Sequence, residues 1–265
     1  MSENIRVSCP NELLFLRPQE VKELCRVGKH SDGGYALCKE AVMNSNHFIS
    51  LGLGEDWSFE RAISEMNPTA TIDIYDHTIS MAFFVIKAIK GSVKFFIGQD
   101  SKSNYFARLK RLVDYCKFWQ ISSKHHHHKV RISRQSFEKI ILDLPEGKLV
   151  GLKVDIEGSE WGILETISKE QSRFEFALIE IHDFDGHEDN LKEFINNLSK
   201  SFILAHVHAN NFEALGSNGF PSVFEISLLR STSITTTGTL RSQLPVIGLD
   251  TPNAKNRPDF VIDFN

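Results

Sequence analysis

The chain has 265 residues, 41% of them hydrophobic and 24% charged, a composition typical of a folded globular protein. Its formal net charge of -4 gives no overall attraction to nucleic acid or to an anionic membrane. The first ten residues lack the layout of a signal peptide and no apolar run could cross a bilayer, so we expect a cytoplasmic protein. We expect one domain over residues 1–265, with an N-terminal extension over 1–45 and a meandering tail over 231–265.

The first part of the chain predicts a helix and then a glycine-rich turn. The helix is expected over Pro18–Cys25. Asp32, Gly33 and Gly34 follow, and glycine accepts positive φ without a steric penalty. Two interpretations stay open: a simple hairpin turn, or a loop that brings backbone N–H groups and Asp32 or Tyr35 to a ligand.

The next unit reads as strand, glycine turn and helix. His47–Leu51 is the strand, Gly52 and Gly54 lie in the turn, and Trp57–Met66 is the helix. Glycines after a strand let the backbone approach a ligand closely, and the helix N-terminus adds N–H donors. The acidic pair Glu55-Asp56 would repel phosphate groups, which argues against NAD or ATP at this turn.

A further strand, Thr71–Tyr75, ends at Asp76, at the distance from the glycine turn where an acid can accept hydrogen bonds from ribose hydroxyls. The alternative is a solvated carboxylate at a strand end. A crossover helix is then expected over His77–Lys90, followed by a strand over Val93–Ile97.

The middle of the chain is less regular. Apolar residues between Phe106 and Cys116 recur at helical spacing, and Phe137–Leu144 predicts another helix. Between them lie four consecutive histidines, His125–His128. Consecutive side chains do not converge on one metal ion, so we expect a mobile, solvated loop there.

The stretch from Leu152 to Trp161 changes from strand to helical periodicity at a glycine. Asp155 and Glu157 end the strand, which places their carboxylates at the carboxyl edge of an α/β sheet, where such folds bind ligands.

Three more strands are expected over Phe176–Ile181, Phe202–Val207 and, running antiparallel, Val223–Leu229. Glu180 and His182 lie two positions apart, so the carboxylate is expected to orient the imidazole. The sequence therefore predicts an α/β sheet with a late antiparallel element. A glycine turn unsuited to phosphates, a ribose-type acid and an acidic edge favour S-adenosylmethionine, whose sulfonium is cationic.

Three segments also resemble a known family. The segment 153–160, K-V-D-I-E-G-S-E, resembles the K-x-D-x-E-G-x-E signature of FkbM-type methyltransferases. Arg26-Val27-Gly28 with D-G-G-Y at 32–35, and S-L-G-L-G at 50–54 with Phe59-Glu60, are similar to a related methyltransferase-like group with a D-G-G-W/Y segment.

The resemblance implies a class I S-adenosylmethionine-dependent enzyme with a doubly wound, mostly parallel, Rossmann-like sheet of seven strands. It places Gly52, Gly54 and Asp76 on the cofactor and Asp155 at the active-site edge. We also expect Asp32, Gly33, Asp155 and Glu157 to bind the cofactor. Many members of the family methylate hydroxyls of sugars and secondary metabolites.

We expect His182 to act as the base that removes the hydroxyl proton, with His208 as its competitor. A divalent metal is the alternative, with ligands chosen from Asp155, Glu180, His182 and His208. Two other functions stay open: a metal-dependent hydrolase that uses the same edge, and a cofactor-binding relic without turnover. The expected partner is a small-molecule or glycan acceptor, with no nucleic acid and no stable membrane insertion. The sequence does not identify the acceptor or the oligomeric state.

Overall fold

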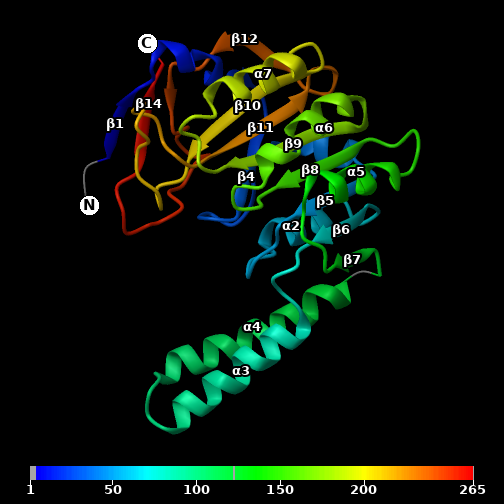
Figure 1. Ribbon diagram of the computed structural model, residues 1–265, viewed down its shortest axis with the longest axis vertical. Coiled ribbons are helices and arrows are strands. Elements are labelled where there is room, and N and C mark those ends of the chain that lie inside the picture. The colour runs from blue at the N-terminus through cyan, green and yellow to red at the C-terminus, as the bar shows by residue number, and fades with distance from the viewer. Residues whose placement is uncertain (1–3, 122, 265) are drawn as a thin grey trace.

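The computed structural model, which describes residues 4–121 and 123–264, contains a central sheet of seven strands in the order β10-β11-β9-β8-β5-β6-β7 (Figure 1). Their bounds are β5 His47–Leu51, β6 Thr71–Tyr75, β7 His125–His128, β8 Val150–Val154, β9 Phe174–Ile181, β10 Phe202–Ala209 and β11 Phe224–Arg230. Strand β11 runs antiparallel to β9 and β10, and the other neighbours pair in parallel. The predicted α/β, Rossmann-like, mostly parallel sheet with a late antiparallel strand is confirmed.

Apolar side chains alternate between the two faces of the sheet, so each face carries its own core. Ile49 and Leu51 of β5 join one core, and Phe48 joins the other. The first core includes residues of the helices α5, α6 and α7 and of the tail, and the second includes residues of α1, α2 and α4. The helices on these two faces are α1 Lys39–Asn44, α2 Ser58–Met66, α5 Arg134–Leu142, α6 Leu164–Lys169 and α7 Glu188–Leu198.

The first and the last strand of the chain lie side by side (Figure 1). Strand β1 Ile5–Ser8 pairs in parallel with β14 Phe260–Asp263, which also pairs with β13 Gln243–Leu244. Strand β12 Thr236–Leu240 pairs with β2 Gln19–Val21.

The helix expected over Pro18–Cys25 is therefore wrong. This segment forms β2 and the start of β3 Leu24–Gly28, and Glu23 between them has a φ of 65°. The partner of β2 lies more than two hundred residues away along the chain. The short-range spacing of apolar residues cannot reveal such a partner.

Two long helices form an arm that projects from the domain (Figure 1). They are α3 Met81–Phe96 and α4 Lys102–Ile121, packed against each other along their length. The strand expected over Val93–Ile97 is wrong, because these residues continue α3 and its C-terminus; short apolar runs do not distinguish strand from helix. Within the described ranges, no helix is long and apolar enough to cross a membrane.

The loop expected over His125–His128 is also wrong, because these residues form β7 at the edge of the sheet. Their rings are held by neighbouring elements. His127 Nε2 lies 2.9 Å from the carbonyl oxygen of Asp76, and His128 Nε2 lies 2.7 Å from Asp73 Oδ1. The imidazoles thus act as structural hydrogen-bonding groups in the last parallel strand.

Candidate functional site

One row of residues crosses the sheet at the carboxyl ends of its parallel strands. Leu51 of β5 pairs with Tyr75 of β6 and with Val154 of β8, so the residues that follow these three lie at one level. The registers of β9, β11 and β10 extend this level across the sheet. In spatial order the row contains His208, Glu225, Glu180, Asp155, Gly52 and Asp76.

The glycine turn after β5 lies at the centre of this row. Gly52 has a φ of 83° and Gly54 a φ of 58°. A Cβ added to Gly52 would lie 1.7 Å from the carbonyl oxygen of Asp155, so glycine alone fits there. The same addition at Gly54 meets nothing within 4 Å. The two glycines therefore have different tasks: one lets two strand ends pass closely, and the other only needs left-handed backbone.

Asp76 holds this turn in place. Its Oδ2 accepts the backbone N–H groups of Leu53 at 2.9 Å and Gly54 at 2.8 Å. Its Oδ1 accepts both the N–H and the hydroxyl of Thr78 at 2.6 Å. Although burial raises the pKa of Asp76, these hydrogen bonds lower it below its ordinary value. Four donors fill the acceptor positions of a carboxylate, so Asp76 fastens the turn instead of standing free for the predicted ribose contact.

A cavity of about 450 Å³ opens at this edge of the sheet. Every residue predicted to bind the cofactor lines it: Asp32, Gly33, Gly52, Gly54, Asp76, Asp155 and Glu157. They come from four separate parts of the chain, and residues 130–132 add a fifth part to the lining. The lining includes six carboxylate side chains but only two from Lys or Arg, so the cavity is acidic.

The turn between β3 and β4 Gly34–Cys38 reaches this cavity, and contact of its D-G-G segment with a ligand stays a prediction. It is a hairpin turn, and it brings Asp32 to the cavity wall. Burial raises the pKa of Asp32, while the side-chain amide of Asn253 in the tail, 3.2 Å away, opposes the shift. Asn253 also donates to Glu225 at 3.3 Å, so the tail joins two acidic groups of the site.

A buried lysine that the sequence interpretation gave no role lies beneath the turn. Lys153 Nζ donates to the carbonyl of Gly52 at 2.8 Å and lies 3.6 Å from both Glu60 Oε1 and Asp155 Oδ2. Burial lowers the pKa of Lys153, but Glu60 and Asp155 raise it overall, so the ammonium stays charged. Tyr35 donates its hydroxyl to Asp155 at 3.3 Å. The signal for this network was a lysine inside an otherwise apolar strand, which requires buried partners.

His182 follows β9 and contacts two carboxylates. Its Nδ1 lies 3.0 Å from Glu160 Oε1, which also accepts its backbone N–H at 2.7 Å. Its Nε2 lies 3.5 Å from Glu157 Oε2. The prediction that Glu180 orients His182 is wrong. Strand β9 ends at Ile181, so the alternation that the prediction assumed stops there, and Glu160 from the turn after β8 takes the position beside the ring.

The surrounding charges shift the pKa of His182 upward. Burial lowers this pKa, but the hydrogen bond to Glu160 and the carboxylates of Glu160, Asp155 and Glu157 raise it by more than burial lowers it. Glu180 is buried in the row and accepts the side-chain amide of Asn210 at 2.7 Å. Burial and the neighbouring carboxylates of Asp155 and Glu225 raise the pKa of Glu180 well above its ordinary value.

His182 lies beside Glu157, which lines the cavity, but neither His182 nor His208, the predicted competing base, is itself part of the lining. His208 is buried. Its Nδ1 lies 3.8 Å from Glu225 Oε2, and neither ring nitrogen has a hydrogen-bond partner among the described residues. The predicted metal set is changed as well. The possible metal-binding group consists of Asp155, Glu157 and His182, whose ligand atoms lie within 4.8 Å of one another. It contains two of the four predicted ligands, Asp155 and His182.

A scan against protein-family models and a search of curated proteins each found no match. The FkbM resemblance therefore rests on the sequence motifs alone.

Among solved structures, the chain is similar to a precorrin-6y C5,15-methyltransferase from Geobacter metallireducens, with 12% identity, 72% of this chain and 86% of that chain covered, and a TM-score of 0.38. A putative rRNA methylase from Clostridium thermocellum gives 9% identity, 72% and 90% coverage and a TM-score of 0.40. An O-methyltransferase of tomaymycin synthesis from Streptomyces achromogenes, in complex with S-adenosylmethionine, is 10% identical, with 72% of this chain and 76% of that chain covered and a TM-score of 0.39. These are remote likenesses, and function follows from the site's own residues.

Proposed function

We propose that the protein is an S-adenosylmethionine-dependent methyltransferase that methylates a hydroxyl of a sugar or small metabolite. One observation carries the proposal: an acidic cavity at the carboxyl edge of the sheet is lined by every residue that the sequence assigned to the cofactor. Ligands of doubly wound α/β folds bind at this edge. The predictions of a cytoplasmic location and of no nucleic-acid partner stand beside this proposal on the sequence alone.

The lining fits this cofactor better than it fits a nucleotide. Its volume of about 450 Å³ lies in the range of small-molecule pockets. The carboxylates of Asp32, Asp155 and Glu157 would repel phosphates but attract a cation. S-adenosylmethionine supplies a methyl group on a cationic sulfonium and contains no phosphate. The turn at Gly52 and Gly54 would pack against its nucleoside, and Asp76 keeps that turn rigid.

His182 is the proposed base. Its Nδ1–H donates to Glu160, which leaves Nε2 free to accept the proton of an acceptor hydroxyl. The imidazolium that results lies between Glu160 and Glu157, and both carboxylates stabilise its charge. Glu160 is a positioning residue, because it fixes the tautomer and orientation of the ring.

The cluster of Asp155, Glu157 and His182 supports a second candidate, a metal-dependent hydrolase. Two carboxylates and an imidazole are common ligands of divalent metals and would activate water. A bound metal is equally compatible with methyl transfer, because it would lower the pKa of the acceptor hydroxyl. The two functions differ in whether the protein binds S-adenosylmethionine.

Calorimetry tests the proposal. We expect wild type to bind S-adenosylmethionine and its demethylated product with micromolar affinity, on the order of −8 kcal/mol. Asp32→Asn should weaken binding of the cationic cofactor more than binding of the neutral product, whereas Glu213→Gln, an exposed site outside the cavity, should change neither. No heat with wild type would remove the proposal and leave the hydrolase.

Assays over a panel of hydroxylated acceptors then separate an enzyme from a cofactor-binding relic. His182→Asn should retain cofactor binding and lose methyl transfer by about a hundredfold or more, the usual contribution of a general base. A protein that binds the cofactor and methylates nothing in the panel, with or without added divalent metal, would be the relic.

A further inference from the structure

The outward face of α3 carries apolar side chains in a continuous stripe along the arm. These residues recur at spacings of three and four, which places them on one side of a helix. Phe96 is 77% exposed and Ile97 60% exposed. The exposed stripe, which we call the α3 stripe, consists of Val85, Ile86, Ile89, Val93, Phe96 and Ile97.

The opposite face of α3 is apolar too, and it is already occupied. Phe84, Ala88 and Gly91 are buried against the rest of the protein, where α3 packs on α4. A helix with apolar side chains on two opposite faces is normally covered by protein or lipid on both. The α3 stripe is instead an extended hydrophobic patch, and patches of this kind mark interaction surfaces.

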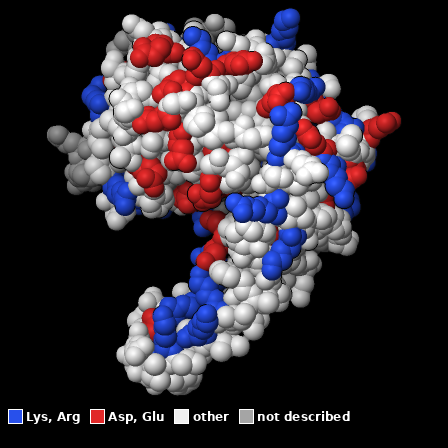
Figure 2. Space-filling model, in the orientation of Figure 1, with Lys and Arg blue, Asp and Glu red and all other residues white. Residues whose placement is uncertain are grey.

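The arm is also strongly basic. Residues 81–121 contain eight Lys or Arg and two acidic residues, although the whole chain has a net charge of -4. Figure 2 shows blue side chains on the arm and most of the red ones on the domain. Within the described ranges no ion pair involves five lysines of the arm: Lys90, Lys94, Lys102, Lys110 and Lys117.

We propose that the arm binds the surface of a bilayer that contains anionic lipids. The α3 stripe would enter the boundary between headgroups and acyl chains, and Lys90 and Lys94, which border it, would contact lipid phosphates. The combination of exposed aliphatic and aromatic side chains with unpaired lysines is what such a surface binds. Support for this interface comes from the residues of the arm and does not rest on the proposed methyltransferase activity.

Two other occupants fit less well. A second copy of the chain would present an equally basic arm, so the two arms would repel each other. A nucleic acid would satisfy the lysines but would leave the aliphatic part of the α3 stripe, including Ile86, Ile89 and Val93, without a favourable contact.

Vesicle cosedimentation of the full chain tests the proposal. Wild type should bind vesicles of phosphatidylcholine with about a third phosphatidylserine, bind pure phosphatidylcholine much less, and lose binding as salt rises from about 0.1 to about 1 M. Lys90→Gln with Lys94→Gln should weaken binding about 30-fold. Phe96→Ser with Ile97→Ser should weaken it about tenfold or more.

Matched controls lie outside the arm. Leu142→Ser with Ile247→Ser removes apolar side chains that are more exposed than Phe96 and Ile97, and Lys200→Gln with Lys255→Gln removes exposed lysines; both pairs should bind vesicles like wild type.

Failure of wild type to bind anionic vesicles would overturn the proposal, and so would arm variants that bind as well as the controls. Sedimentation analysis and an RNA-binding titration identify the alternatives. A dimer that the Phe96 and Ile97 substitutions dissociate, or RNA binding that the Lys90 and Lys94 substitutions abolish, without vesicle binding, would also overturn it.

Discussion

Replacement of Asp76 by asparagine tests whether this carboxylate fastens the glycine turn. The change keeps the shape of the side chain but replaces one acceptor oxygen by an NH₂ group. With the NH₂ group toward Leu53 and Gly54, both of their N–H groups face a donor. With the NH₂ group toward Thr78, the hydroxyl can turn to accept from it, but the N–H of Thr78 faces a donor. At least one hydrogen bond is lost, and the others lose their charge assistance.

The magnitude follows from the burial of these groups. Asp76 is 6% exposed, and the N–H of Leu53 is buried with it. A hydrogen bond to a charged group contributes about 1.5–3 kcal/mol, and an unsatisfied buried donor costs about 1–3 kcal/mol. Loss of one such bond, together with one donor left unsatisfied, is therefore expected to lower the free energy of unfolding by about 3 kcal/mol. The loosened turn should also weaken cofactor binding.

Urea denaturation measures the first effect and calorimetry with S-adenosylmethionine the second. Asp143→Asn, an exposed aspartate at the end of α5, is the control and should change neither. A variant of Asp76 with wild-type stability but without cofactor binding would refute the reasoning, because it would make the carboxylate a direct ribose ligand. The pH dependence has a definite sign. Because the pKa of Asp76 is lowered in the fold, its stabilisation is present above the unfolded pKa and lost as pH falls through the folded value.

Three further predictions concern other residues of the fold and site. Because the pKa of His182 is raised, methyl transfer should increase as pH rises through that value; Glu160→Gln should shift the rate profile to lower pH, and an unchanged profile would exclude Glu160 as the positioning residue. Gly52→Ala should fail to fold or lose cofactor binding, whereas Gly54→Ala should cost about 1 kcal/mol in thermal or urea unfolding, and similar effects of both would contradict the close approach. Asp250→Asn leaves the buried histidine of β10 that it contacts without its charged partner, and should destabilise by about 3 kcal/mol. Burial raises the pKa of Asp250, but His206 lowers it, and the net shift is downward. Wild type should therefore lose this stabilisation as the pH falls through the folded pKa, whereas the variant should not.

The parts of the fold that local patterns determine could be predicted from the sequence. The bounds of His47–Leu51 and Thr71–Tyr75 agree with the structure. The first is fully buried and reads as a short, mostly apolar run before a turn, and the second alternates between buried and half-buried residues as a strand does. The lining of the cavity was also predictable. Gly52 and Asp155 come directly after such strands, and parallel strands end at one edge.

The errors have a common physical origin in contacts between distant residues. The sequence did not reveal that the Asp76 carboxylate would accept the N–H groups of Leu53 and Gly54, because these hydrogen bonds depend on how closely the ends of β5 and β6 approach each other. Glu160 was missed as the partner of His182 because a turn after β8 brings it across to the end of β9. The aliphatic run in α3 was divided between helix and strand because nothing in it marks which neighbours will cover it.

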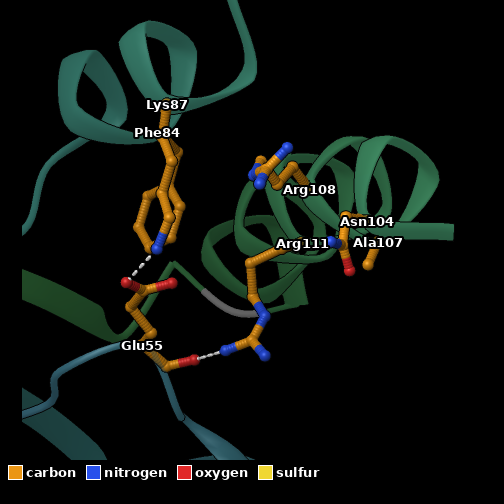
Figure 3. Close-up of a pocket in the computed structure, with 7 residues that line it drawn as sticks. All are labelled: Glu55, Phe84, Lys87, Asn104, Ala107, Arg108 and Arg111. Atoms are coloured by element: carbon orange, nitrogen blue, oxygen red, sulfur yellow. Dashed lines mark hydrogen bonds and ion pairs between the residues drawn. The ribbon is translucent and has the colours of Figure 1, made fainter. Parts of the chain in front are cut away.

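Contacts at the base of the arm connect it to the lining of the cavity. Figure 3 shows Lys87 of α3 reaching the carboxylate of Glu55, and Arg111 of α4 reaching its backbone carbonyl. Glu55 follows Gly54 directly and lines the cavity as well as the pocket at the base of the arm. A force that tilts the arm would thus pull on both ends of one residue next to the glycine turn. Engagement of the arm and occupancy of the cavity are then expected to be thermodynamically linked, each altering the affinity of the other by the same factor.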